Sequence, residues 1–174
     1  MKKMLIASAI AMTMSAGSAM ANNQQSEIQF LGVVTETTCD ISSSVDGAVN
    51  EVVQLGTVKK GEMGEVKSIF LKAKAGTTCA NLANKTATIL FQGPLGDKGL
   101  ENSKGSAANT YVELKAANAK TANQDIKKGS NSADFDAELV NNTGYQIDAK
   151  LKADDVNATA GTFESALAYA VTYK

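Results

Sequence analysis

Short runs of alternating or β-branched residues, separated by turns rich in glycine and asparagine, cover most of the chain. Such runs are typical of β-strands, because successive side chains of a strand point to opposite faces of its sheet. Helical periodicity is weak, and residues 116–128 fit either one turn of helix or a long loop. Many short strands joined by glycine turns predict an all-β antiparallel sandwich rather than a parallel sheet. We expect strands at Glu27–Val34, Thr38–Ile41, Val52–Val58, Glu65–Lys72, Thr86–Gln92, Thr110–Lys115, Gly144–Lys152 and Thr162–Tyr173.

The composition excludes several classes of function. The 174 residues include no histidine, and all 17 basic residues are lysines. Without histidine there is no Ser-His-Asp or Cys-His catalysis and no imidazole metal ligand. Without arginine, and with a net charge of -1, the chain has no electrostatic footprint for nucleic acid. We therefore predict no enzymatic activity, no catalytic residues, no cofactor and no nucleic-acid partner.

A metal site made of carboxylates alone is the remaining alternative in this class. Asp134 and Asp136 lie close together, but their surroundings lack the glycine and glutamate of a calcium loop. Other neighbouring acids, such as Asp154 and Asp155, are typical of solvated surface charge. No metal site is predicted.

Residues 1–21 have the pattern of a secretory signal peptide. Lys2 and Lys3 precede an apolar stretch, and the small residues around Met20 form a cleavage signal that ends at Ala21. The stretch is shorter than the roughly 20 residues that a membrane span needs. We expect cleavage between Ala21 and Asn22 and export of the mature chain.

Export determines how the two cysteines are interpreted. Cys39 and Cys79 are the only cysteines, and in an oxidising compartment they are expected to form a disulfide. A redox-active pair would instead have C-x-x-C spacing, which these residues lack.

The last run of the chain alternates over its whole length. Its bulky side chains share one face and small or polar ones share the other, so an apolar strand is expected near the C-terminus. A second alternating run follows the polar start of the mature chain, and either run is equally compatible with an ordinary strand of its own sheet. The C-terminal apolar face comprises Phe163, Leu167, Tyr169, Val171 and Tyr173, and the N-terminal run comprises Ile28, Phe30, Gly32 and Val34.

Together these features resemble the major structural subunits of chaperone–usher pili, the fimbrial pilins of enteric bacteria, and in particular type 1 pilins. The matching marks are Phe30 and Gly32 near the mature N-terminus, the cysteine spacing, Gln54-Leu55-Gly56, Gly161 at the fourteenth position from the end and the penultimate Tyr173. Each mark alone is weak, but their order on an exported chain is specific.

The resemblance implies an incomplete immunoglobulin-like sandwich that lacks its seventh strand and is completed by donor-strand exchange. Residues 22–34 would be the donor extension and residues 35–174 the pilin domain. Ile28, Phe30, Gly32 and Val34 would enter the groove of the next copy.

Gly161 and the C-terminal apolar face would form the acceptor groove and the edge bound by a periplasmic chaperone. The chain would then pass through an outer-membrane usher to the cell surface. There it would form a homopolymeric fimbria, with minor or tip subunits, that supports adhesion.

An alternative keeps the family but adds receptor binding. Loops within Gly93–Asn109 or Ala119–Ser132 are rich in polar residues, which suit hydrogen bonding to a host glycan or protein receptor as well as plain solvation.

Overall fold

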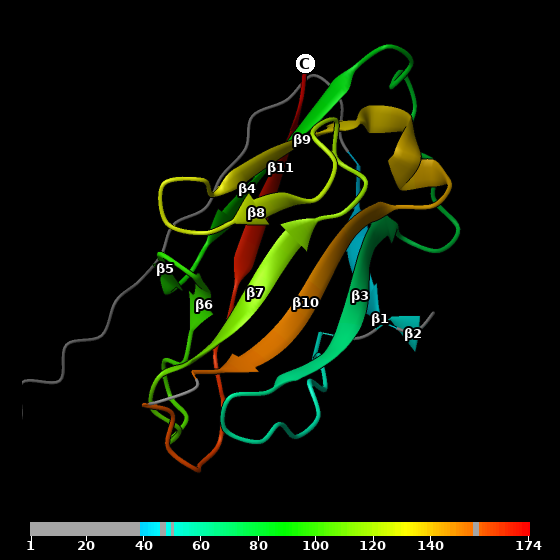
Figure 1. Cartoon of the computed structure of the whole chain (residues 1–174). Helices are drawn as coiled ribbons and strands as arrows, with labels where there is room; N and C mark the ends of the chain where they lie inside the picture. The colour runs from blue at the N-terminus through cyan, green and yellow to red at the C-terminus, as the bar shows by residue number, and fades with distance from the viewer. Residues whose placement is uncertain (1–38, 46–47, 50, 155–156) are drawn as a thin grey trace, which may run out of the picture. The chain divides into compact units, whose positions relative to one another are not determined.

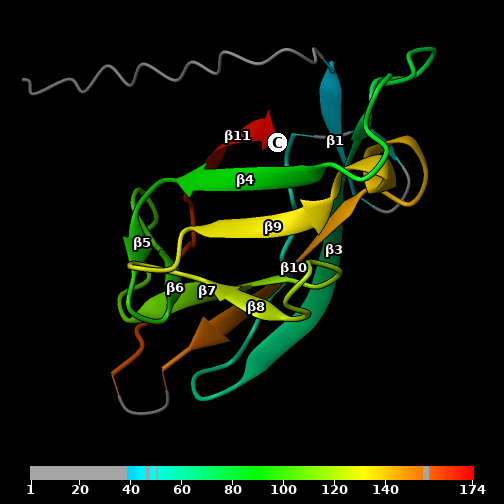
Figure 2. The same cartoon turned by 90° about the horizontal axis from the view of Figure 1, so that it is seen from above.

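The computed structural model describes residues 39–45, 48–49, 51–154 and 157–174. Within them the chain forms two antiparallel β-sheets and a short 3-10 helix, η1, at Ala137–Asn141. The sheets lie as two layers, seen from the side in Figure 2, with the strand labels given in Figure 1. The predicted all-β sandwich is confirmed.

The larger sheet has eight strands in the order β2-β1-β3-β10-β7-β6-β5, with β8 also paired to β7. The smaller sheet has three strands in the order β11-β4-β9. The strands of the larger sheet are β1 (Ile41–Val45), β2 (Ala48–Val49), β3 (Met63–Ala73), β5 (Leu95–Gly96), β6 (Gly99–Glu101), β7 (Thr110–Ala116), β8 (Gln124–Ile126) and β10 (Tyr145–Ala153), and those of the smaller sheet are β4 (Thr86–Gln92), β9 (Ser132–Asp136) and β11 (Ala168–Tyr173).

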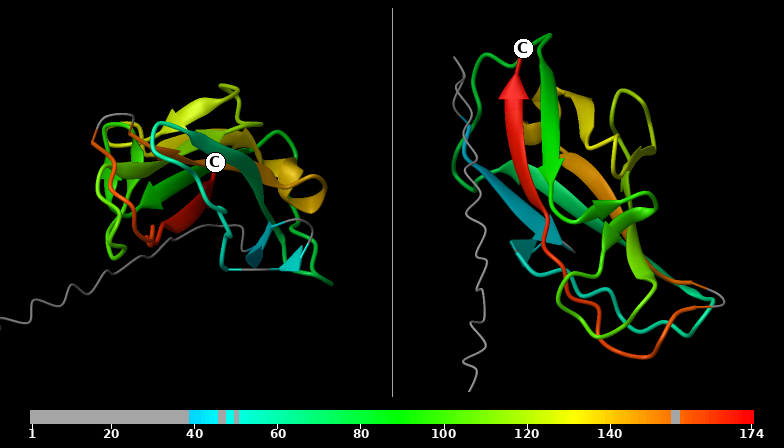
Figure 3. Two further views of the ribbon diagram at one scale, coloured as in Figure 1. Left: turned by 60° about the horizontal axis from the view of Figure 1, so that its bottom comes forward. Right: turned by 90° about the vertical axis from the view of Figure 1, so that its left-hand side faces the viewer.

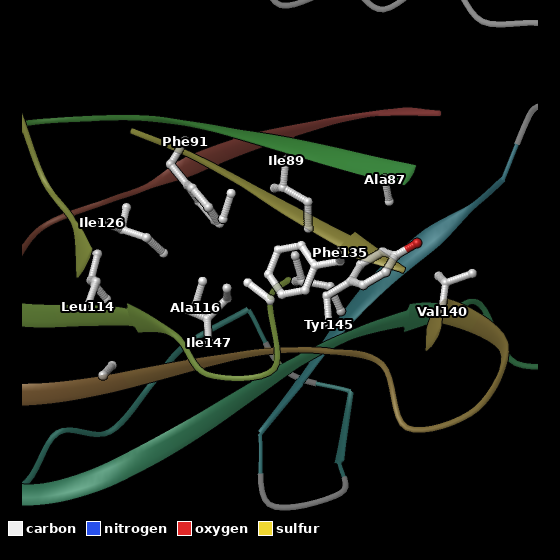
Figure 4. Packing of buried hydrophobic residues seen from close by; sticks show 14 of the residues in the cluster. Ala87, Ile89, Phe91, Leu114, Ala116, Ile126, Phe135, Val140, Tyr145 and Ile147 are labelled. Atoms are coloured by element: carbon white, nitrogen blue, oxygen red, sulfur yellow. The ribbon is translucent and has the colours of Figure 1, made fainter. Parts of the chain in front are cut away.

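Alternation along the strands builds the core. In β4 and β10 every second side chain is buried, and the intervening ones face outward. This is the period expected of sheets that pack on one face only. Phe135 and Tyr145 meet at the centre of the core with ring centroids 5.1 Å apart (Figure 4).

The order of the strands is that of an immunoglobulin-like sandwich. In chain order β1, β3, β4, β7, β10 and β11 correspond to strands A to F. They give A-B-E-D in one sheet and C-F in the other. In the part of the chain that the structure describes, no strand takes the place of G beside β11. The predicted incomplete immunoglobulin-like fold is confirmed to this extent.

Two expected strands differ from the structure. Residues 52–58 belong to neither sheet, and their apolar alternation reflects packing of Leu55 and Val58 against the core. The last strand begins at Ala168 rather than Thr162, because Thr162 and Glu164 bond to the loop around residue 103 instead of to a strand.

Smaller differences concern short elements. The first described strand is Ile41–Val45, slightly later than expected, and residues 116–128 hold β8 rather than a turn of helix. The short strands β2, β5, β6 and β9 and the helix η1 were absent from the predicted elements. The first three have only two or three residues, and β9 alternates over only five.

Candidate functional site

An apolar groove opens between the two sheets, beside the C-terminal strand. Its volume is about 600 Å³. One wall consists of residues 51–55, and the other consists of residues 163–167 together with Tyr169. The floor is formed by core side chains, Ile69, Leu71, Phe91, Leu100, Val112, Leu114, Ile147 and Ala149.

The chemistry of the groove suits an apolar occupant. Its floor is formed by hydrocarbon side chains, and the polar residues that line the groove are Ser43 of β1 and those of the walls, such as Glu51 and Glu164. Covering apolar surface contributes about 25 cal/mol per Å², so an extended segment with large apolar side chains gains most by binding here.

The backbone of β11 offers hydrogen bonds on its open side. Lys174 and Thr86 exchange both backbone hydrogen bonds at 2.9 Å, so Thr172 and Ala170 also bond toward β4 in this antiparallel ladder. The N–H and C=O groups of the alternate residues, Tyr169 and Val171, therefore point to the opposite edge. No strand within the described ranges pairs with that edge; the right panel of Figure 3 shows β11 beside β4, its partner in the sheet. The groove thus lies next to a strand whose outward-pointing backbone groups are available to an added β-strand.

Only part of the predicted C-terminal face lines the groove. Phe163, Leu167 and Tyr169 are half-buried and line it. Val171 and Tyr173 pack against the core further along β11 but do not line the groove. Gly161 lies outside it, against the backbone of Ser106 and Ala107.

Three tyrosines of this region have raised pKa values. Burial raises the pKa of Tyr145, and a contact with the Tyr173 hydroxyl adds to the shift. Burial likewise raises the pKa of Tyr173. For Tyr169, burial is again the main cause, and the Glu51 carboxylate on the opposite wall contributes. All three side chains stay neutral at physiological pH, as an apolar interior requires.

The two cysteines form the expected disulfide. Cys39 and Cys79 are bonded, with 5.2 Å between their Cα atoms. The bond joins the residue just before β1 to the loop between β3 and β4. Asn141 fixes that loop, because its amide accepts from the Cys79 N–H and donates to the Cys79 carbonyl, both at 2.9 Å.

The predicted N-terminal residues lie outside the described ones. This concerns Ala21 and Asn22 at the expected cleavage point, and Ile28, Phe30, Gly32 and Val34 of the expected donor segment. Their roles remain predictions.

Two parts of the site were missed from the sequence. Residues 51–55 form one wall, although residues 52–58 were expected to be a strand. Asn102, a single polar residue in a loop, makes four hydrogen bonds, two within its own loop and two to the C-terminal segment that forms the other wall. No local pattern marks an asparagine for such a role, because the two partners in the C-terminal segment lie about 60 positions away in the chain.

Comparison with known proteins gives the family. The chain is 41% identical to the F107 fimbrial protein of Escherichia coli over 175 residues, covering 100% of both chains. The chain belongs to the fimbrial proteins. It is also 30% identical to the K99 fimbrial protein of E. coli, covering 99% of each.

Among solved structures, the P pilus rod subunit PapA has a TM-score of 0.49 at 17% identity, covering 86% of this chain and 100% of that one. No protein-family model matches the chain.

Membership in this family makes the chain a structural subunit of a surface fimbria, not an enzyme. No helix in the described part of the chain is long and apolar enough to cross a membrane.

The two acids considered for a metal site, Asp134 and Asp136, have structural partners. Asp134 accepts a hydrogen bond from the Thr88 hydroxyl at 2.7 Å, and Asp136 lies 3.6 Å from the Lys120 ammonium.

Proposed function

We propose that this fimbrial subunit polymerises head to tail, by inserting residues 22–34 of one copy into the groove of the next. The observation that carries the proposal is the apolar groove beside the open edge of β11. It offers both things that an added β-strand needs, which are backbone partners and pockets for alternate side chains.

The N-terminal segment has the pattern that such a groove favours. Ile28, Phe30, Gly32 and Val34 alternate with other residues, so one face of an extended segment is apolar except for a small gap at the glycine. Three large apolar side chains buried at about 25 cal/mol per Å² contribute several kcal/mol. Backbone pairing with β11 would supply the register.

An unoccupied edge needs protection before assembly. An exposed strand edge next to apolar side chains is a template for aggregation. We propose that a periplasmic chaperone covers β11 after cleavage between Ala21 and Asn22, and that an outer-membrane usher exchanges it for the next subunit. Basic chaperone residues would bind the terminal carboxylate of Lys174.

The polymer follows from the location of the two surfaces. Groove and inserting segment belong to one molecule, so each contact is heterologous and leaves both ends of the polymer free to grow. Such contacts generate an open filament, to which minor or tip subunits would be added at the ends.

Deletion of residues 22–34 tests this function. The truncated mature subunit is expected to be recovered from the periplasm with its chaperone, but to enter no fibre as the inserting partner. A matched variant lacking only the polar residues 22–26 should still assemble, since it retains Phe30 and its apolar neighbours. Electron microscopy of cells that express either variant shows whether fibres form. Normal fibres from the longer deletion would overturn the proposal.

Receptor binding by this subunit has no specific support. A second, polar hollow of about 400 Å³ lies near Lys98. Its lysine is already paired, because Lys98 bonds to Asp154 at 3.1 Å and its ammonium lies 5.6 Å from the centre of the Tyr111 ring. We therefore propose no receptor site there.

A further inference from the structure

The C-terminal wall of the groove is held by a loop instead of by strand pairing. We call residues 161–167 the wall segment and residues 102–107 the clasp loop. The Ser103 and Lys104 N–H groups donate to the Glu164 carbonyl at 3.1 and 3.0 Å. The Ala107 N–H donates to the Thr162 carbonyl at 3.0 Å. The wall segment is thus fastened to the clasp loop through the backbone groups of Thr162 and Glu164.

The Asn102 side chain is at the centre of this contact. Its Nδ2 donates to the carbonyls of Ala107 at 2.7 Å and Thr162 at 3.0 Å. Its Oδ1 accepts from the N–H groups of Gly105 and Glu164, both at 2.9 Å. One amide therefore closes the clasp loop on itself and fastens it to the wall segment.

Close approach of backbones makes the contact sensitive to side chains. A Cβ atom at Gly161 would lie 2.5 Å from the Ala107 nitrogen, and one at Gly93 would lie 2.7 Å from the Ala166 carbonyl oxygen. Real Cβ atoms do not approach that closely, so any larger residue there would push the wall segment off its support. This gives a physical reason for the glycine at position 161, which does not itself line the groove.

We propose that Asn102 is a positioning residue for strand uptake, which holds the groove open at the width of an extended strand. The inference rests on the proposed function. A wall segment that is fixed in advance spares the incoming strand the entropy of ordering it. Without the clasp, the wall segment would have to be ordered at each insertion, and the inserted strand would be released faster.

The test measures release of a labelled peptide with the sequence of residues 22–34. The full mature chain is refolded from denaturant with excess peptide, and release is followed after adding unlabelled peptide. Loss of the four Asn102 hydrogen bonds should speed release about tenfold in Asn102→Ala. Gly161→Ala should act in the same direction. Thr162→Val, which removes only one hydroxyl from the contact, provides a milder variant if Asn102→Ala fails to fold.

The control is Asn118→Ala, which also removes hydrogen bonds between a side-chain amide and the backbone, to Gly144 and Gln146 at 2.9 and 2.8 Å. Asn118 does not line the groove, so this variant should lose stability yet release peptide at the wild-type rate. Wild-type release rates in folded Asn102→Ala, Gly161→Ala or Thr162→Val would overturn the positioning role alone. Equal acceleration in the control would overturn it as well. Failure of the wild-type chain to hold the peptide, at an excess that outcompetes residues 22–34 of other copies, would instead overturn the proposed function, and the positioning role with it.

Discussion

At the scale of single residues, Tyr145 shows how the core tolerates a polar group. The residue is completely buried, and its hydroxyl donates to the Ala137 carbonyl at 2.9 Å. A buried phenol that keeps its hydrogen bond is stable only while neutral, which is why burial raises its pKa.

The raised pKa predicts a loss of stability in alkali. Above the ordinary tyrosine pKa of about 10, the unfolded chain loses the Tyr145 proton while the folded chain keeps it, so unfolding becomes more favourable as pH rises. We expect the free energy of unfolding to fall by up to about 1.4 kcal/mol per pH unit from this residue. Urea unfolding between pH 8 and 11 measures the slope, and Tyr145→Phe should flatten it. An equal slope in the variant would contradict the claim that Tyr145 causes this pH dependence.

At the scale of elements, long alternating strands could be predicted from the sequence, as could several residues of the C-terminal wall of the groove, but the wall formed by residues 51–55 could not. The strands β4, β7 and β10 lie close to their expected positions, because each buries alternate side chains. The strand β3 also lies close to its expected position, although Leu71 is its only buried residue. The segment 52–58 shows the same alternation without belonging to a sheet. Of its apolar residues, Leu55 and Val58 pack on the core while Val52 is exposed, and period alone does not distinguish such a segment from a strand.

The last strand illustrates the same limit. Its alternation continues from Thr162 to Tyr173, yet pairing begins only at Ala168 because the clasp loop takes the earlier backbone groups. Contacts between residues far apart in the chain decided this boundary, and a local pattern carries no information about them.

Because one edge of β11 does not pair with β4, a proline in this strand is expected to impair fibre assembly but not folding. Val171→Pro removes an N–H group that points away from β4, while the bonds to β4 come from Ala170 and Thr172. The variant is therefore expected to fold, but fibre yield should fall about tenfold for the loss of one backbone bond with an incoming strand.

The control for this prediction is Val171→Ala, which shortens the side chain and keeps the N–H group. It should assemble better than the proline variant. Quantitative immunoblotting of sheared fibres measures both, and equal yields would show that this edge takes no part in assembly.

At the scale of the whole molecule, the disulfide joins the start of the described chain to the loop between β3 and β4. The bond between Cys39 and Cys79 closes a loop with a sequence separation of 40, which corresponds to roughly 4 kcal/mol in the chain-entropy account. We expect Cys39→Ser to lower the urea midpoint of the mature subunit and its yield in the periplasm. The double variant with Cys79→Ser should lose no more than the single one. Unchanged yield in both would mean that the disulfide is dispensable for folding.

The central claim is that one subunit completes the sandwich of the next. Its most direct test places a photo-crosslinking phenylalanine analogue at position 30 and irradiates assembled fibres. We predict a ladder of crosslinked oligomers, with crosslinks that map by mass spectrometry to groove residues such as Phe91 or Leu167 of a different copy. Crosslinks confined to single chains, or mapping to the outer faces of the sheets, would contradict the account.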